Sequence, residues 1–319
     1  MTKVVLVFLL SILMCSPMAH AAQEVWQDLN AQVAQLVQDQ KIREAHKTSE
    51  MAVAVAKDLF GDKDPRLAIA LRQMADLAVQ VDKRADATRS LNEAIVIWQK
   101  ELGNNHPFLI AIYKRLSSIY IEGGAYEDAL RALNQARDAQ EKWFGNEPHS
   151  ALATTYKEMA QVHERQAQWD KALPLYNEAL EIEQNIFGAG TQRVANTLRE
   201  RANILLGLGS FEDARKDQTH VIEINKQLKN QTREELAMDL TLLAETYAKL
   251  NNSYEAIRLW TMAVDILDNP TAEPTFKLKA LILFRLREHY LSIGDEAQAQ
   301  ATNERALELE KEAQTKLNP

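Results

Sequence analysis

The sequence predicts an all-α protein in which about seven helix-turn-helix units stack into a solenoid. An alanine recurs every 42 or 43 residues, at positions 45, 87, 129, 172, 214, 256 and 299. A second small residue lies seven positions after each of them, at 52, 94, 136, 179, 221, 263 and 306. A third recurs in the preceding helix, at 33, 75, 117, 160, 202 and 244, with Arg287 in the last unit. A fixed period of this length is typical of stacked helical repeats, and small residues let two antiparallel helices approach closely.

The chain begins with the three parts of a secretory signal peptide. Lys3 gives a positive start, Val4–Met14 is an apolar run, and Ala19-His20-Ala21 resembles a cleavage site. The run is too short to cross a bilayer, which takes ~20 apolar residues. Cys15 raises the alternative of a lipid-modified cysteine, which Met14 disfavours because the residue before such a cysteine is small. We therefore expect residues 1–21 to be removed and the protein to be periplasmic or secreted.

Composition excludes several classes of function. Cys15 is the only cysteine, so the mature chain would have no disulfide, no catalytic thiol and no thiolate metal site. The net charge of −8 argues against a binder of nucleic acid or of anionic membranes, which would carry a basic excess.

After the signal peptide, the same types of residue recur at the boundaries between repeats. Gln23–Phe60 reads as the first helix pair, Phe60-Gly61 ends it, and Asp64-Pro65 opens the next unit. The same pattern recurs at 102–107, 144–148 and 187–188. We expect these glycines to adopt the left-handed conformation that ends a helix, and proline to start the next one. Asn230 takes the glycine position in the fifth unit, and Asn269-Pro270 predicts a looser joint after the sixth.

The spacing resembles that of the tetratricopeptide repeat (TPR) family. The pattern of large, small and aromatic residues is clearest at Tyr113, Leu116-Ser117, Tyr120, Tyr126, Ala129 and Ala136. The 42-residue unit and the Gly103-Asn-Asn-His-Pro107 stop resemble the subclass in kinesin light chains. The resemblance implies a right-handed α-α superhelix whose first helices line a concave, peptide-binding groove. It covers residues 22–319 as one domain, in repeats at about 23–64, 65–106, 107–147, 148–190, 191–231, 232–273 and 274–319. Departures at Ser49, Gln218, Tyr254 and Arg287 suggest that the end units are caps.

One row of residues is predicted to line that groove. The same position of the first helix is basic in four consecutive units, at Arg72, Lys114, Lys157 and Arg199. One turn further on lie hydrogen-bonding residues, at Asp76, Ser118, Gln161 and Asn203. Packing is not expected to demand a cation here, since other units have Asn30, Thr241 and Phe284. The row would suit an acidic, partly apolar peptide or a chain end that bears a carboxylate. The alternative is a solvated helix face, with Arg72–Asp76 an ordinary i,i+4 pair.

No motif for catalysis, cofactor binding or metal binding is evident. His163-Glu164 lacks the second histidine of a zinc-protease motif. Gly207-Leu208-Gly209 differs from a phosphate loop because it follows a helix and no lysine comes after it. We expect a monomeric scaffold, not an enzyme, that binds a protein or peptide and neither nucleic acid nor a cofactor. An accessory role in an envelope assembly or polysaccharide-export complex is the main alternative, and a small-ligand binder or enzyme is a third.

Overall fold

The computed structural model describes residues 17–145, 147–229, 231–268 and 275–317, and within them the side chains from residue 20 to residue 312. Residues 1–16 of the predicted signal peptide, Asn230 and the joint at Asn269-Pro270 lie outside the described residues. Pro17–Ala21 belong to the first described helix.

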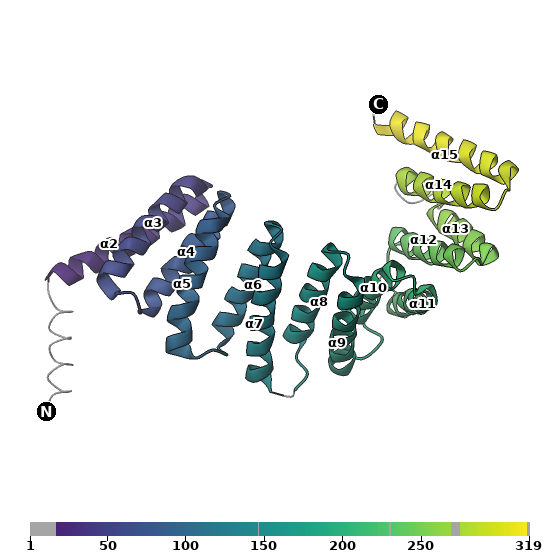
Figure 1. Ribbon diagram of the computed structural model, residues 1–319. Coiled ribbons are helices and arrows are strands. Elements are labelled where there is room, and N and C mark those ends of the chain that lie inside the picture. The colour runs from purple at the N-terminus through teal and green to yellow at the C-terminus, as the bar shows by residue number, and fades with distance from the viewer. Residues whose placement is uncertain (1–16, 146, 230, 269–274, 318–319) are drawn as a thin grey trace. The chain divides into compact units, whose positions relative to one another are not determined.

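The described helices form seven antiparallel hairpins, and the described part of the chain contains no strand (Figure 1). This confirms the predicted all-α fold of about seven helix-turn-helix repeats. In chain order the hairpins pair α2 (Pro17–Gln38) with α3 (Ile42–Phe60), α4 (Pro65–Gln80) with α5 (Arg84–Leu102), α6 (Pro107–Glu122) with α7 (Tyr126–Phe144), α8 (Ser150–Arg165) with α9 (Trp169–Phe187), α10 (Gln192–Gly207) with α11 (Phe211–Leu228), α12 (Arg233–Lys249) with α13 (Ser253–Leu267), and α14 (Phe276–Ser292) with α15 (Glu296–Leu317).

Backbone contacts divide the chain between Glu147 and Pro148 into two compact units. Unit 1 holds α2–α7, and unit 2 holds α8–α15. The division falls where one predicted repeat ends and the next begins. Within each unit, consecutive hairpins pack on one another, so that each covers the apolar face of its neighbour.

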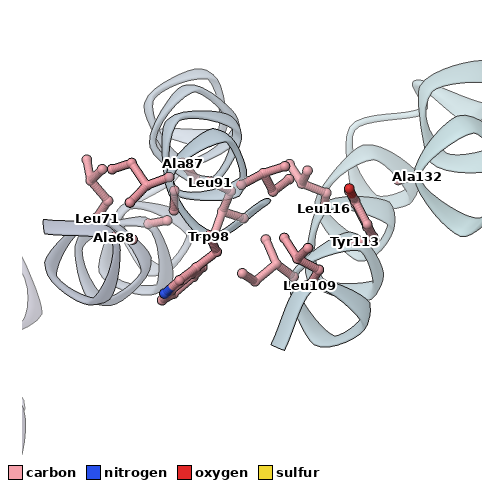
Figure 2. Close-up of a cluster of buried hydrophobic side chains, with 14 of the residues drawn as sticks. Ala68, Leu71, Ala87, Leu91, Trp98, Leu109, Tyr113, Leu116 and Ala132 are labelled. Carbon is pink, nitrogen blue, oxygen red and sulfur yellow. The ribbon is translucent and has the colours of Figure 1, made fainter. Parts of the chain in front are cut away.

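The recurring small residues lie at the helix crossings. All seven alanines of the first series are at most 3% exposed, and so is every member of the second series. Leu71, Leu91, Trp98, Leu109 and Tyr113 fill the space between hairpins in the core of unit 1 (Figure 2). Val33 and Arg287, which hold the third small position in the end repeats, are only half-buried.

Each hairpin turn contains one residue with positive φ, although only three of the seven are glycines. The residues are Gln40, Asp82, Gly124, Ala167, Gly209, Asn251 and Gly294, with φ between 54° and 80°. A residue with a Cβ pays ~1–2 kcal/mol for this conformation. The turn geometry is therefore imposed by packing of the two helices and not by local sequence alone.

Glycines end the second helix of four repeats, with a geometry that differs from the prediction. Gly61, Gly103 and Gly188 have φ of 82°, 78° and 82°, positive as expected, but ψ of 169°, 167° and 157°. These values lie in an extended region that is essentially confined to glycine, not in the left-handed helical region. The chain thus turns sharply from one repeat into the next, where Asp64 and His106 cap the following helices by accepting from Arg66 N and Phe108 N.

Candidate functional site

Unit 1 has an apolar groove between the first helices of two successive repeats. It lies between α4 and α6, over α5, and encloses about 550 Å³. Phe108 is 61% exposed and Ile69 44% exposed, so the groove presents apolar surface to water. The lining residues are Ile69, Arg72, Asp76, Leu91, Trp98, Phe108, Ala111, Ile112 and Arg115.

The charged wall of this groove has a surplus of one positive charge. Arg115 Nε donates to Asp76 Oδ1 at 2.9 Å, and Arg72 Nη1 lies 3.5 Å from Asp76 Oδ2. Two guanidinium groups therefore share a single carboxylate, and both remain at least one-third exposed. The structure brings the predicted residues Arg72 and Asp76 into this groove, whereas Lys114 and Ser118 are not among its lining residues.

Phe108 occupies a repeat position at which other repeats have arginine. In those repeats the guanidinium covers the aromatic ring that ends the preceding helix: Arg66 over Phe60 at 3.6 Å and Arg193 over Phe187 at 4.9 Å. Phe108 instead stacks on Trp98, with ring centroids 6.1 Å apart, and on His106, at 5.2 Å. At this joint the preceding helix ends at Leu102 instead of a phenylalanine, and Phe108 itself stays 61% exposed. Sequence reasoning missed Phe108, Ile69 and Arg115, although Ile69 lies one helical turn before Arg72 on the same face.

In unit 2, the predicted basic residue Lys157 is engaged by buried polar groups. Its Nζ lies 3.2 Å from Glu183 Oε1 and donates to Thr197 Oγ1 at 3.2 Å. Thr197 Oγ1 in turn donates to Glu183 Oε2 at 2.6 Å. The Glu183 side chain is only 3% exposed. Lys157 thus links α8 to α9 and α10 and neutralises a carboxylate that cannot reach water.

Arg199 is held in the same way, one repeat further on. Its Nε and Nη2 donate to the two oxygens of Asp239, each at 3.0 Å, across from α10 to α12. The Asp239 side chain is 8% exposed and also accepts from Gln231 at 2.6 Å and Asn225 at 3.4 Å. The expectation that packing demands no cation in this row is wrong at Lys157 and Arg199, because each compensates a buried carboxylate.

A second groove, also of about 550 Å³, lies between α10 and α12. Most of its lining residues are of polar or charged type; they are Gln192, Asn196, Arg199, Asn225, Gln231, Glu235, Met238, Asp239 and Leu242. Asn203 lies outside this groove and lines a neighbouring hollow of about 10 Å³, together with Gln218. Of the predicted residues in unit 2, Arg199 alone lines the larger groove.

Comparisons with known proteins agree with this architecture. A family profile described as tetratricopeptide repeat matches residues 83–142 and 151–227. These two segments contain tetratricopeptide repeats. A search of curated proteins finds no match.

Solved TPR structures share the fold at low sequence identity. The C-terminal part of a TPR repeat-containing protein from Cytophaga hutchinsonii is 11% identical over 88% of this chain and 94% of its own, with a TM-score of 0.61. BtubC (BKLC) from P. vanneervenii is 20% identical over 77% of this chain and 96% of its own, with a TM-score of 0.54. TPR-like repeats assigned to a kinesin light chain of Podosopora anserina are 18% identical over 64% of this chain and 96% of their own, also at 0.54.

The fourth and fifth TPRs share one further polar cluster. Burial raises the pKa of Glu200, and the negative charges of Glu183 and Glu164 raise it further, against the opposing effects of Lys157 and of a hydrogen bond from Gln161. Burial likewise raises the pKa of Tyr176, whose hydroxyl donates to Glu164 Oε2 at 3.4 Å. The predicted residue Gln161 thus contacts Glu200 of the next repeat.

Among the described residues, no group of three or more His, Cys, Asp or Glu side chains is placed to hold a metal ion. No described helix is both long enough and apolar enough to cross a membrane.

Proposed function

We propose that this protein is an exported scaffold that holds an acidic, partly apolar segment of another polypeptide in the groove of unit 1. One observation carries the proposal: the groove combines exposed apolar side chains with two guanidinium groups that share one carboxylate. The signal peptide predicted for residues 1–21 supports a location in the periplasm or outside the cell. A non-enzymatic role agrees with the TPR fold, since such repeats present surfaces for partners.

The dimensions and charge of the groove support this partner chemistry. A volume of about 550 Å³ accommodates one or two bulky side chains but not a folded domain. Burying the exposed faces of Phe108 and Ile69 gains roughly 25 cal/mol for each Å² removed from water. A carboxylate of the partner would pair with the guanidinium charge that Asp76 leaves uncompensated, and this attraction is screened by salt over ~10 Å at 0.1 M.

The test is capture of partners from an envelope extract by the chain without residues 1–21, with two matched variants. Phe108→Ala introduces the residue that the fourth repeat has at the equivalent position, Ala151, and removes the apolar side chain without adding charge to the groove. Val96→Ser removes a 66% exposed apolar side chain of α5 that does not line the groove. A partner that is lost with Phe108→Ala, retained with Val96→Ser and weakened by salt supports the proposal. Equal capture by all three proteins contradicts it.

Export is tested separately. The proposal expects the protein recovered from cells to begin after Ala21 or Ala22. Recovery of a cytosolic chain that still begins at Met1 contradicts export without affecting the proposed groove.

A further inference from the structure

The groove of unit 1 contains an indole N–H with no hydrogen-bond partner. Trp98 on α5 lines this groove and is 5% exposed. Its Nε1 donates to no other described residue, yet the atom is open to solvent, unlike the unpaired indole nitrogens of Trp26 and Trp260, which are fully buried. Figure 2 shows this nitrogen at the end of the ring that points away from the other labelled side chains. Because an indole nitrogen can only donate, this position suits an acceptor on a ligand.

Most donors of the two groove arginines are also unused. Arg72 and Arg115 each contact Asp76 through one nitrogen, and neither guanidinium bonds to any other described residue. A guanidinium carries five N–H donors and no acceptor. Asp76 is the only acidic residue that lines the groove. The wall formed by these three residues is therefore positive and rich in donors.

The rest of the groove suits the apolar body of a small molecule. Its volume of about 550 Å³ lies within the range of small-molecule pockets, which is ~300–1,000 Å³. Ile69 and Phe108 present apolar surface beside the charged wall. The surplus of one positive charge matches a monoanion, whereas a cation would meet uncompensated positive charge. A ligand that satisfies both walls therefore combines a carboxylate with an apolar chain.

We propose that the groove of unit 1 binds a free apolar monocarboxylate of the size of a medium-chain fatty acid. Its carboxylate would accept from Arg72 and Arg115, and its chain would cover Ile69 and Phe108. The inference rests on the groove of the proposed function but gives it a ligand that is not a polypeptide. Since the fatty acid and an acidic polypeptide segment need the same groups, they compete, and the fatty acid regulates capture of the polypeptide.

The test titrates the full chain with octanoate by isothermal titration calorimetry. Octan-1-ol has a chain of the same length without charge, octylamine carries the opposite charge, and acetate keeps the carboxylate without the chain. Octanoate should bind roughly tenfold more tightly than octan-1-ol, as expected for hydrogen bonds to a charged group. Octylamine and acetate should bind still more weakly. Octanoate binding should weaken at high salt, because the guanidinium groups are exposed.

Two variants change the charge of the groove in opposite directions. Arg72→Ala removes the surplus charge and leaves Arg115 paired with Asp76, so octanoate should bind roughly tenfold more weakly. Asp76→Asn adds one positive charge and should strengthen binding. Arg89→Ala is the matched control, because this side chain is 76% exposed, belongs to unit 1 and lies outside the groove. It removes the same charge from the chain as Arg72→Ala and should leave the affinity unchanged.

The indole N–H of Trp98 gives a second measurement. In proton–nitrogen correlation spectra, the indole resonance that is missing from Trp98→Phe should shift when octanoate is added. The resonance that is missing from Trp260→Phe, in unit 2, should not shift, since that nitrogen is fully buried.

No binding of octanoate, equal binding of octanoate and octan-1-ol, or equal affinity of the wild type and Arg72→Ala overturns the inference. A partner captured by the groove should be released by octanoate and retained in acetate. Octanoate binding is measured without a polypeptide, so the two proposals can fail separately. If octanoate binds as expected but Phe108→Ala retains every partner, the proposed function alone is wrong. If Phe108→Ala loses a partner and octanoate does not bind, only the fatty-acid ligand is wrong.

Discussion

Replacing Arg199 with alanine should destabilise the protein far more than the same replacement of Arg72, although the two arginines occupy equivalent repeat positions. Arg199→Ala removes the two hydrogen bonds that the guanidinium donates to the carboxylate of Asp239, a side chain that is 8% exposed. Breaking a buried ion pair costs ~3–5 kcal/mol when the remaining charge is uncompensated. Asp239 keeps its bonds from Gln231 and Asn225, so we expect about 2–4 kcal/mol. In Arg72→Ala the lost contact is 3.5 Å long and exposed on both sides, and the cost should stay below ~0.5 kcal/mol.

The measurement is the melting curve of each variant by far-UV circular dichroism. A destabilisation of 1 kcal/mol lowers the melting temperature of a unit of this size by ~2–4 °C, so Arg199→Ala should melt roughly 5–15 °C lower. Adding Asp239→Asn to Arg199→Ala should restore part of this loss, because the uncompensated charge is gone. If the two single variants melt at the same temperature, the assignment of Arg199 to a structural ion pair is wrong.

Three further predictions follow from comparing repeats within the chain. Arg201 and Asp217 form a bidentate ion pair at 2.7 and 2.8 Å, where the next repeat has two leucines. Changing both to leucine should therefore leave thermal stability equal or higher, whereas Asp217→Leu alone should lower it. Ala167→Gly should raise the free energy of unfolding by ~0.5–1 kcal/mol, because Ala167 has a φ of 54°, while Gly124→Ala, where φ is 73°, should lower it. The pKa of Glu200 is raised in the folded state, so ionisation of Glu200 opposes folding, and this penalty grows as the pH rises from about 4.5 towards neutrality. Glu200→Gln should therefore raise the melting temperature at pH 7 and make it depend less on pH.

The sequence predicts the fold well because the repeated features are geometric requirements. Two helices can cross closely at Ala129 or Ala172 only if the side chains are small, and this constraint recurs in every hairpin. The helix ends could also be predicted from the sequence, because Gly61 and Asp64-Pro65 act through local backbone geometry. The ψ values of the glycines between repeats could not be predicted from the sequence, because they depend on how the next helix packs.

The site residues were harder to predict because side chains on one helix face can point to different partners. The repeat spacing alone predicts a regular row of basic residues, which includes Arg72, Lys157 and Arg199. What each cation meets depends on the residue 40 positions later or on the second helix, such as Asp239 or Glu183. Helix periodicity carries no information about such contacts between repeats. Comparing equivalent positions would have flagged them: Glu183 and Asn225 occupy a position that is Trp98 and Leu267 elsewhere.

These polar contacts between repeats distinguish repeats whose apolar frames are nearly identical. Arg115 bonds back to Asp76 in unit 1, and Arg285 approaches Glu245 at 3.5 Å in unit 2, at equivalent positions. Gln161 and Glu200 are one equivalent pair between them in sequence. Because an uncompensated buried charge is costly, we infer that the buried carboxylates Glu183 and Asp239 disfavour stacking against a repeat that lacks the matching cation. The same differences set the charge of the two grooves: in unit 1 the guanidinium groups of Arg72 and Arg115 share the single carboxylate of Asp76, whereas in unit 2 Arg199 is paired with Asp239.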